Sequence, residues 1–578
     1  LSFHDCCAMS FICRGKPPSR SIGTYVLAAT VVCCCWTSDS IAYETPLQFE
    51  DVSGPAGIDF QHHSPLTPER HLHLFMGSGA GWLDYDRDGW PDLYLGQGKS
   101  LEVEASKSQP RNRFLANSGD GVFRDVTESA CLTNTDYSMG VAVGDFDNDG
   151  FPDVYVSSYG QNRLYHNNGD ASFSEIAADR HVADDRFGAS STWADIDGDG
   201  DLDLFVANYL RLDKDDYPLC KHTELGKTYH SGCHPRYQKH EYDILYRNDG
   251  NGAFTDISEE SGLQSGPARC GLGVLATDLD DDGDLDFYVA NDTVHNQLWI
   301  NDGGGVFTDD ALVAGVAVNR IGQAEAGMGL AAGDVDGDGL PDLFVTNYFS
   351  ESNTFYRNEG FGFTDVTSEY GLSAPSKLRL AFGASLFDVD NDGWLDLFVA
   401  NGHVHTEQPA MGRNEPFAQL PQLFRNQNGR RFSDVSALSG DYFDRRLVGR
   451  ASCVADFDRD GRLDLAVQHL NGAAALLRNK TASVGRVIQI ELVGTESSRD
   501  GNNAVVFVKV GGRQITRASI GSSSYLSSSD SRLTIGIGKN DVVDSVEVRW
   551  PGGRKEVWHS LSTSDAHQLI EGTGSAEN

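Results

Sequence analysis

Basic residues are scarce in this chain of 578 residues. It carries 46 lysines and arginines against 84 aspartates and glutamates, which gives a formal net charge of -38. A surface with this charge repels phosphate backbones and anionic lipid headgroups. The composition therefore argues against nucleic acid and anionic membranes as partners.

Long apolar segments are missing from all but the first 42 residues. No later stretch approaches the roughly 18 apolar residues that a membrane-spanning helix needs. Near the start, a basic segment (14–20) precedes an apolar one (22–36), and Ser40-Ile41-Ala42 is typical of a cleavage site. We predict a signal peptide over 1–42, no transmembrane segment after its removal, and a protein that is secreted, periplasmic or bound at the cell surface.

Cysteines are few once that segment is set aside, because six of the eleven fall within it. In an exported protein, two cysteines 13 residues apart are most simply a disulfide, so we predict the bond Cys220–Cys233. Cys270 and Cys453 are expected to be small core residues. The fifth remaining cysteine is Cys131.

Two alternatives to these cysteine assignments stay open. A lipobox ending at Cys33 would anchor the chain instead of releasing it. Histidines flank the predicted disulfide, and with the cysteines they could form a transition-metal site, since such ions prefer nitrogen and sulfur ligands. These histidines are His222, His230 and His234.

A nine-residue pattern, Asp-x-Asp-x-Asp-Gly-x-x-Asp, occurs seven times, and its four aspartates are never substituted. Positions 1, 3 and 5 of a curled loop can turn their carboxylates inward, and glycine at position 6 permits a positive φ. The aspartates are Asp84, Asp86, Asp88 and Asp92; Asp145, Asp147, Asp149 and Asp153; Asp195, Asp197, Asp199 and Asp203; Asp278, Asp280, Asp282 and Asp286; Asp334, Asp336, Asp338 and Asp342; Asp388, Asp390, Asp392 and Asp396; and Asp456, Asp458, Asp460 and Asp464.

Four converging carboxylates require a counter-ion. At about 4 Å and an effective dielectric constant of about 20, each like-charged pair is destabilised by about 4 kcal/mol. Ca²⁺ accepts six to eight oxygen ligands in loose geometry, whereas Mg²⁺ demands an octahedron, and the backbone carbonyl at position 7 can supply a further ligand. We predict about seven structural Ca²⁺ ions. An acidic turn without an ion is the alternative, and the missing glutamate at position 12 excludes an EF-hand.

Each loop belongs to a larger repeated unit. An apolar run precedes the loop, and alternating apolar residues follow it, as in Asp153-Val154-Tyr155-Val156. A short segment ending in asparagine and another beginning with phenylalanine complete four strands, which is typical of a propeller blade. We predict an all-β protein whose residues 43–480 form a seven-bladed β-propeller with calcium loops.

The order of the strands predicts how the propeller closes. Phe49–Val52 precedes the first loop, while the last unit stops at Asn479 without a strand of this kind, so we expect Phe49–Val52 to complete the last blade. Loops between second and third strands should lie on the face opposite the metal loops. Both long insertions, 209–242 and 403–422, fall there, and loops of this length are often functional.

The pattern changes from Val484 onward. Alternating strands such as Val487–Leu492 and Ser545–Trp550 continue without an aspartate loop, and a serine-rich turn spans Ser522–Ser531. We predict a separate small C-terminal β-domain over 484–572.

Two resemblances support this organisation. The repeats resemble the FG-GAP/VCBS family, the calcium-loop propeller repeats of integrin α-subunits. The C-terminal segment is similar to the ASPIC/UnbV domain through 521–530, Gly536-Ile537-Gly538 and 546–553. The combination resembles the cartilage acidic protein family, which implies a secreted calcium-binding protein without a well-established enzymatic activity.

Three functional hypotheses follow. The first is a non-enzymatic adhesion or binding module in which Ca²⁺ stabilises the blades and the insertion face binds a protein or glycan. The second is an enzyme whose base or metal ligand is His295, His403, His405 or the Cys220 region, although no set of nucleophile, base and orienting group is visible. The third is an adhesive that self-associates through Ca²⁺.

Overall fold

The computed structural model describes residues 45–99, 110–211, 220–224, 226–250, 252–408, 413–482 and 484–576. The predicted signal peptide lies outside these residues. Within them, no helix has both the length and the apolar character needed to cross a membrane. Contacts join Thr45–Asn578 into one compact unit.

Each aspartate loop joins the first two strands of a four-stranded antiparallel sheet, as predicted. The described residues contain seven sheets built on this unit; six have four strands, and that of the first blade carries two further short strands. The first strands are β2 (Ala80–Leu83), β6 (Ser138–Gly144), β10 (Gly188–Ala194), β16 (Gly271–Thr277), β20 (Leu330–Gly333), β24 (Ala381–Phe387) and β28 (Gly449–Ala455). The second strands are β3 (Asp92–Leu95), β7 (Asp153–Ser158), β11 (Asp203–Asn208), β17 (Asp286–Asn291), β21 (Asp342–Val345), β25 (Asp396–Asn401) and β29 (Asp464–His469).

The asparagine and phenylalanine signatures mark the two outer strands. The third strands are β4 (Arg113–Asn117), β8 (Arg163–Asn167), β14 (Ile244–Asn248), β18 (Gln297–Asn301), β22 (Thr354–Asn358), β26 (Gln422–Asn426) and β30 (Ala475–Asn479). The fourth strands are β5 (Phe123–Asp125), β9 (Phe173–Glu175), β15 (Phe254–Asp256), β19 (Phe307–Asp309), β23 (Phe363–Asp365), β27 (Phe432–Asp434) and, for the last sheet, β1 (Phe49–Asp51).

The sheets form a closed ring. First strands contact one another in the order β2, β6, β10, β16, β20, β24 and β28, and β28 returns to β2. β1 pairs antiparallel with β30, with Phe49 opposite Asn479, which confirms the predicted closure. Because the first and last parts of the repeat region share one sheet, the ring leaves no unpaired junction between its ends.

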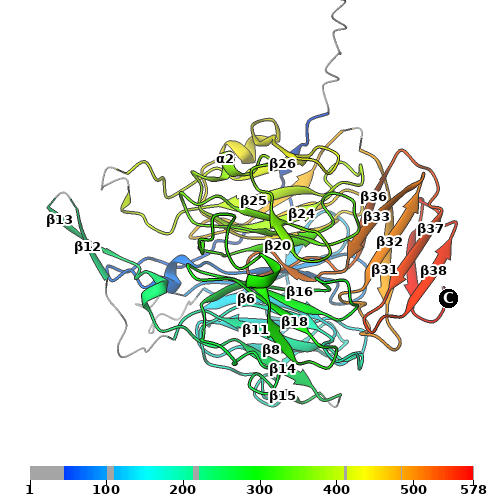
Figure 1. Ribbon diagram of the computed structural model, residues 1–578, viewed down its shortest axis with the longest axis horizontal. Helices are drawn as coiled ribbons and strands as arrows, with labels where there is room; N and C mark the ends of the chain where they lie inside the picture. The colour runs from blue at the N-terminus through cyan, green and yellow to red at the C-terminus, as the bar shows by residue number, and fades with distance from the viewer. Residues whose placement is uncertain are drawn as a thin grey trace, which may run out of the picture. The chain divides into compact units, whose positions relative to one another are not determined.

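Short helical turns and one hairpin lie between the strands. The hairpin of β12 (Cys220–Glu224) and β13 (Lys227–Ser231) lies in the predicted insertion 209–242, between β11 and β14. In Figure 1 it projects on the side away from the orange and red C-terminal strands. The helical turns are η1 (Leu72–Phe75), η2 (Pro235–Tyr237), α1 (Ala311–Ala314), α2 (Ser373–Ser376), η4 (Ser436–Leu438) and η5 (Asp441–Asp444).

The C-terminal region forms two sheets of its own. One joins β36 (Leu533–Gly538), β31 (Arg486–Val493) and β39 (Ala566–Ile570). The other joins β33 (Arg513–Ala518), β32 (Val505–Val510), β37 (Ser545–Arg549), β38 (Lys555–His559) and β40 (Ser575–Ala576). The predicted strands at Val487–Leu492 and Ser545–Trp550 correspond to β31 and β37.

The serine-rich turn is not a surface turn of a separate domain. Its short strands β34 (Ser522–Ser523) and β35 (Ser527–Ser528) extend the sheet of the first blade through β2. Tyr525 and Leu526 are buried in one core cluster with Met139, Ala189, Leu272 and Phe382, which come from four first strands. We call residues 522–529 the axial segment, because it packs where the first strands meet.

Polar groups of the axial segment pair with the first strands. Ser524 and Leu330 exchange backbone hydrogen bonds of 2.6 and 2.9 Å. The Ser524 hydroxyl accepts from Ala384 N–H at 3.1 Å, and the Leu526 carbonyl accepts from Val141 N–H at 3.0 Å. These bonds satisfy backbone groups that burial would otherwise leave unpaired. The C-terminal region thus has two sheets of its own, while its serine-rich turn packs in the propeller core.

Candidate metal centres

In each aspartate loop, backbone N–H groups donate to the loop's own carboxylates, and the bond from the N–H of position 7 to the aspartate at position 5 is present in all seven. The second loop is an example. Asp145 accepts from the N–H groups of Asp149 at 3.0 Å and Gly150 at 2.8 Å, and Asp149 accepts from Phe151 N–H at 2.8 Å. Gly150 has φ +94°, and the glycine at position 6 has a positive φ in all seven loops. This is the conformation predicted from the sequence.

The loops bring their carboxylates together. Among the described residues, sets of loop aspartates whose ligand atoms lie within 4.8 Å of one another include Asp84, Asp86 and Asp92; Asp145, Asp147 and Asp149; Asp195, Asp197 and Asp199; and Asp278, Asp280 and Asp282. In the fifth, sixth and seventh loops, neighbouring carboxylates raise one another's pKa in addition to the effect of burial, as at Asp336, Asp392 and Asp456.

Burial makes these carboxylates costly to charge. Burial raises the pKa of Asp92 and Asp286 to about 8, and that of Asp153 to about 7. Asp145 is the first aspartate of the second loop, and burial together with the charge of Asp500 raises its pKa to about 8. A cation bound among these groups would favour the charged form and offset the penalty.

Several carboxylate oxygens have no hydrogen-bond partner although they are buried. These are Oδ1 of Asp84, Oδ1 of Asp278 and Oδ1 of Asp458. A buried acceptor without a donor is costly unless an ion or water occupies the position. The all-oxygen set therefore fits a hard cation such as Ca²⁺.

The ninth aspartate links the loop to its blade. Asp153 Oδ2 accepts from Phe146 N–H at 3.2 Å, within the loop, and Oδ1 accepts from Asn167 N–H at 2.8 Å, at the end of β8. The same pair of contacts recurs in the other six repeats.

The asparagines that end the third strands connect adjacent blades, a role that the sequence analysis missed. Each donates its side-chain amide to the carbonyl at position 2 of the preceding blade's loop. Their recurrence in step with the loops was the available signal. The pairs are Asn117 with Phe457, Asn167 with Tyr85, Asn248 with Phe146, Asn301 with Ile196, Asn358 with Leu279, Asn426 with Val335 and Asn479 with Val389, at 2.8 to 3.0 Å.

The C-terminal sheets cover the metal loops. Arg549 pairs with Asp281 at 2.8 Å and lies 3.4 Å from Asp278, and Arg513 donates to the Asp392 carbonyl at 3.0 Å. Gln489 donates to Asp456 at 2.8 Å. These contacts place cations and amide donors from the C-terminal region beside loops of different blades.

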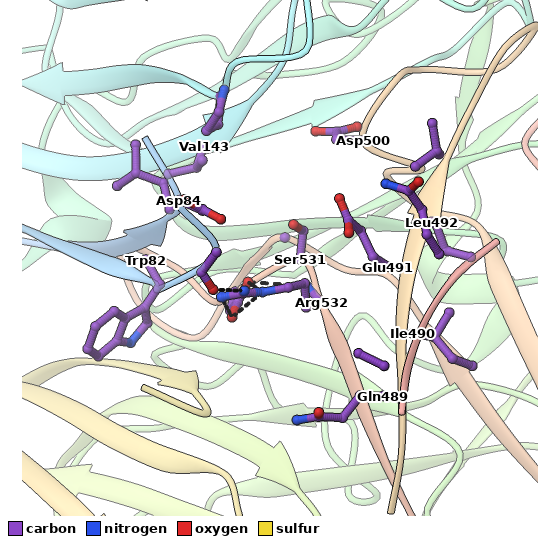
Figure 2. A pocket seen from close by; sticks show the side chains of 18 of the residues that line it. Trp82, Asp84, Val143, Gln489, Ile490, Glu491, Leu492, Asp500, Ser531 and Arg532 are labelled. Atoms are coloured by element: carbon purple, nitrogen blue, oxygen red, sulfur yellow. Dashed lines mark hydrogen bonds and ion pairs between the residues drawn. The ribbon is translucent and has the colours of Figure 1, made fainter. Parts of the chain in front are cut away.

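A cavity of about 430 Å³ lies between the first, second and last loops and the C-terminal strands. Figure 2 shows Arg532 in this cavity among Asp84, Glu491 and Asp500. Arg532 also donates to the Gly89 carbonyl in the first loop. Positively and negatively charged side chains therefore both line the cavity between the loops and the C-terminal strands.

The turns between third and fourth strands share the face of the metal loops, as predicted. A Cβ atom at Gly119 would lie 2.3 Å from the Trp90 ring, and one at Gly169 would lie 3.0 Å from the Phe151 ring. Trp90 and Phe151 occupy position 7 of their loops.

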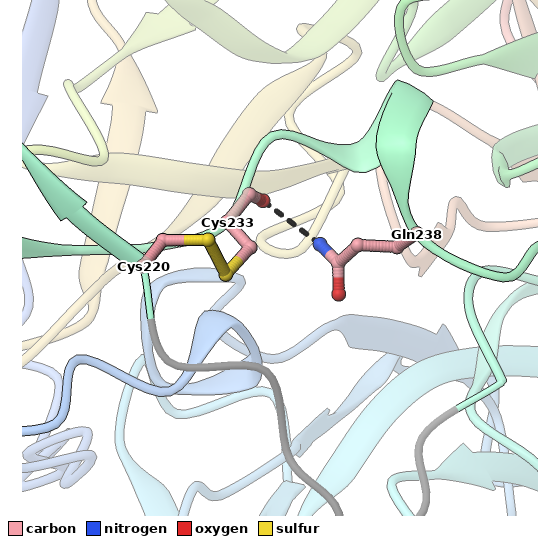
Figure 3. The surroundings of a disulfide bond; sticks show 3 residues. All are labelled: Cys220, Cys233 and Gln238. Carbon is pink, nitrogen blue, oxygen red and sulfur yellow. Dashed lines mark hydrogen bonds between the residues drawn. A yellow bond between two sulfur atoms is a disulfide. The ribbon is translucent and has the colours of Figure 1, made fainter.

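The two long insertions, 209–242 and 403–422, lie close to each other. The structure contains the predicted disulfide between Cys220 and Cys233, and Gln238 donates to the Cys233 carbonyl at 2.8 Å (Figure 3). A Cβ atom at Gly232 would lie 3.1 Å from Leu72 and 4.0 Å from His405. The two insertions and η1 therefore meet. We call this surface the insertion face.

The histidines considered for catalysis have structural partners. His403 Nδ1 accepts from His405 N–H at 2.9 Å, and its Nε2 lies 3.6 Å from Glu415. Burial lowers the pKa of His403 to about 3, so its ring is neutral near pH 7. His405 Nδ1 lies 3.4 Å from Glu407, whereas His295 contributes its carbonyl, which accepts from Arg269 and Asn291.

The predicted core cysteines, Cys270 and Cys453, are buried, and Cys131 is exposed. Of the histidines near the disulfide, His230 lies opposite Lys221 in the hairpin, and His234 immediately precedes η2. His222 is placed opposite Tyr229.

Comparisons with known proteins agree with this organisation. FG-GAP-like repeats match residues 84–156, 145–206, 278–345, 334–399 and 388–467, which together cover more than half of the chain and all seven loops. The ASPIC and UnbV family matches residues 494–576.

Among curated proteins, cartilage acidic protein 1 of Mus musculus and of Homo sapiens are each 28% identical over 329 residues. Each match covers 55% of this chain and 47% or 46% of the relative. The matched region thus spans about half the length of these relatives.

Distant solved structures were also found. YCF48 bound to D1 peptide has a TM-score of 0.38 at 9% identity, covering 73% of this chain and 95% of that one. The Bacillus licheniformis rhamnogalacturonan lyase PL11 has a TM-score of 0.36 at 14% identity, covering 75% and 76%. At these scores the likenesses bear on neither ligand nor activity. The family matches and the ring of sheets together show that this chain belongs to the FG-GAP-repeat proteins that also carry an ASPIC and UnbV domain.

Proposed function

We propose that this chain is a secreted, calcium-binding β-propeller that acts as a non-enzymatic binding or adhesion module. Ca²⁺ occupies each aspartate loop and stabilises the blades. The insertion face binds a protein or a glycan. The observation that carries the proposal is the convergence of buried carboxylates in loops that are themselves tied into the ring by the asparagines.

The calcium part of the proposal follows from the cost of charging the loops. Asp278 is 91% buried, and its Oδ1 has no hydrogen-bond partner. A divalent ion would supply the missing partner and cancel repulsion between the aspartates of one loop. Extracellular calcium-binding modules have dissociation constants of about 10⁻⁴ to 10⁻³ M, so such sites fill outside the cell.

Metal analysis and thermal melting test this part. We expect about seven Ca²⁺ per chain by mass spectrometry of the full chain, and a clear fall in melting temperature with EDTA. Asp280→Asn, at position 3 of its loop, should reduce the calcium count by one, whereas Asp302→Asn, in an exposed turn, should not. A melt that EDTA leaves unchanged would refute the structural role.

We assign binding to the insertion face because the C-terminal sheets cover the other face of the propeller. The C-terminal sheets lie over the metal loops, whereas the insertion face carries both long connections and the disulfide-bonded hairpin. Tyr237, in the first insertion, is 83% exposed. Exposed tyrosines are frequent anchors at interfaces, because they bury a large area at low entropic cost.

Binding of extracellular proteins and glycans to the immobilised chain tests the face. Tyr237→Ala should weaken binding of the selected partner about tenfold. Phe361→Ala is the control, since Phe361 is 91% exposed in the turn between β22 and β23, on the metal-loop side. Equal losses in the two variants would contradict the assignment.

An enzyme with a site on the insertion face is the second candidate. The observation that favours it is that His405 contacts His403, which in turn lies beside Glu415. Turnover that is abolished by His403→Gln but retained in Tyr237→Ala would establish it.

A further inference from the structure

The residue before the asparagine that ends each third strand varies among the repeats. This residue lies on the third strand, beside the loop of its own blade. In the last two blades it is an arginine that pairs with the aspartate at position 3, Arg425 with Asp390 and Arg478 with Asp458. In chain order the seven residues are Ala116, His166, Arg247, Ile300, Arg357, Arg425 and Arg478.

Only the second repeat places a side chain at this position that can ligate a metal ion. His166 Nδ1 lies 3.2 Å from Asp153 Oδ1 and 3.4 Å from Asp147 Oδ2. One atom from each of the three side chains lies within 4.8 Å of the others. The loop thus offers one imidazole nitrogen and two carboxylate oxygens to a common point.

We propose that Asp147, Asp153 and His166 form a site for a first-row transition ion, with Zn²⁺ as its probe. The proposal rests on the aspartate loops being cation sites, and it assigns a different ion to one of them. Imidazole nitrogen suits zinc and related ions, whereas Ca²⁺ takes oxygen ligands.

The distances fit such an ion. Zinc binds nitrogen and oxygen ligands at about 2.0 to 2.2 Å in tetrahedral geometry, which separates the ligand atoms by about 3.3 to 3.5 Å. The 3.2 and 3.4 Å separations around His166 Nδ1 are close to this value. Two of the three separations therefore already match zinc coordination, and the third lies within 4.8 Å.

The ligands are held by the fold. The Asp153 side chain is fully buried and accepts from Phe146 N–H and Asn167 N–H, so its oxygens have fixed directions. His166 is fixed on β8 between neighbours paired with β7 and β9, and its ring lies 6.1 Å from that of Phe146. The side chains of His166 and Asp147 remain about a quarter exposed, at 25% and 28%, which leaves a path for the ion and a position for water.

A simpler role for His166 is that of a counter-charge, like the arginines of the last two blades. The two roles differ in a measurable way. Arginine can replace a counter-charge but cannot ligate a metal, because the guanidinium stays protonated. His166→Arg therefore separates ligation from charge.

The experiment is zinc titration of the untagged full chain in millimolar Ca²⁺, with zinc and calcium counted by mass spectrometry. We expect one zinc per chain in the wild type, which replaces calcium in the second loop, so that the calcium count is about six instead of the about seven expected without zinc. His166→Ala and His166→Arg should each weaken zinc binding by at least about tenfold, because loss of even an outer partner of a metal ligand commonly costs about 10- to 100-fold. Calcium in the other loops should be unchanged.

A variant that should gain a zinc site tests the proposal in the opposite direction. Ala116→His places an imidazole beside Asp86 and Asp92, whose atoms already approach one another in the first loop. It should add a second zinc. Circular dichroism and melting of each variant exclude unfolding as the cause of a loss.

The proposal is overturned if zinc is absent from the folded wild type, or if zinc binding survives both His166 variants. Absence of calcium from a chain that binds zinc through His166 would instead refute the calcium proposal. The two failures are therefore distinguishable.

Discussion

Asn117 in the first blade donates its side-chain amide to the Phe457 carbonyl in the last blade, at 2.8 Å. This bond closes a circle of seven equivalent bonds between a third strand and the preceding blade's metal loop. The same asparagine donates to the Pro91 carbonyl at 3.2 Å and accepts from Gly119 N–H at 3.1 Å. Ring closure and loop geometry are thus coupled through one side chain.

Asn117→Ala should lower the free energy of unfolding by about 2 to 3 kcal/mol, because it removes these hydrogen bonds and leaves buried carbonyls unpaired. Urea unfolding in saturating calcium measures the change. Asn168→Ala is the matched control, since Asn168 is exposed and its side chain bonds to Ser172 and Ser174 of its own blade, and its effect should stay within about 0.5 kcal/mol. Equal effects in the two variants would contradict a closing role for Asn117.

Calcium should reverse the pH dependence of stability. In the calcium-free chain, burial raises the pKa of Asp92 and Asp286 to about 8. The folded chain then holds protons that the unfolded chain has released, so stability should fall as the pH rises from about 5 to 8. Bound calcium keeps these carboxylates charged and removes the effect.

Buried histidines should then dominate the calcium-bound chain. Burial lowers the pKa of His62 and His73 to about 3. Below about pH 6.5 the unfolded chain binds protons that these folded side chains cannot, so stability should fall with acidification. Melting temperatures at pH 5 and 7, with calcium and with EDTA, measure both slopes. Slopes of the same sign would show that the loop carboxylates do not carry the effect.

Gly79→Ala should displace the axial segment. A Cβ atom at Gly79 would lie 1.7 Å from the Leu526 carbonyl oxygen, and neither backbone can yield without breaking its pairing. We expect a lower melting temperature and faster tryptic cleavage at Arg532, which follows the segment. Gly54→Ala, where nothing lies within 4 Å, is the control. Unchanged cleavage at Arg532 in Gly79→Ala would show that the segment stays in place.

Removing the disulfide with Cys220→Ser and Cys233→Ser should affect the hairpin more than the propeller. The bond closes a loop of 13 residues, and a loop of this size is stabilised by about 3 kcal/mol in the chain-entropy description. The hairpin is an insertion, so we expect faster cleavage at Lys221 and Lys227 with little change in the melting temperature of the ring. A large fall in that temperature would instead make the hairpin part of the cooperative unit.

Local patterns predicted the strands and loops closely. Each second strand begins at the ninth aspartate, each third strand ends at the asparagine and each fourth strand begins at the phenylalanine, because alternation and turn residues act over neighbouring positions. The pairing of the Phe49 strand with the last blade was also predictable, because the last unit is the one that lacks a fourth strand of its own. The positive φ at Gly150 followed from the same loop pattern.

Contacts between distant residues could not be predicted in this way. Ser522–Ser531 has the composition of a solvated turn, yet Ser524, Tyr525 and Leu526 are buried among first strands. No local signal distinguishes the two situations, because partners of the segment such as Val141 and Ala384 lie far away in the sequence. The position of His166 between Asp147 and Asp153 likewise depends on the pairing of β8 with β7.

The amino-acid sequence alone determined the all-β repeat, the number of aspartate loops, the order of strands and the cysteine pair, because each depends on residues within one unit or on simple counting of units. Only the tertiary structure decided that the C-terminal region covers the aspartate loops and inserts a segment into the core. It also decided which side chains meet at each loop. These outcomes depend on the packing of surfaces far apart in the chain, and such packing is fixed by complementary shape and hydrogen bonding and not by local pattern.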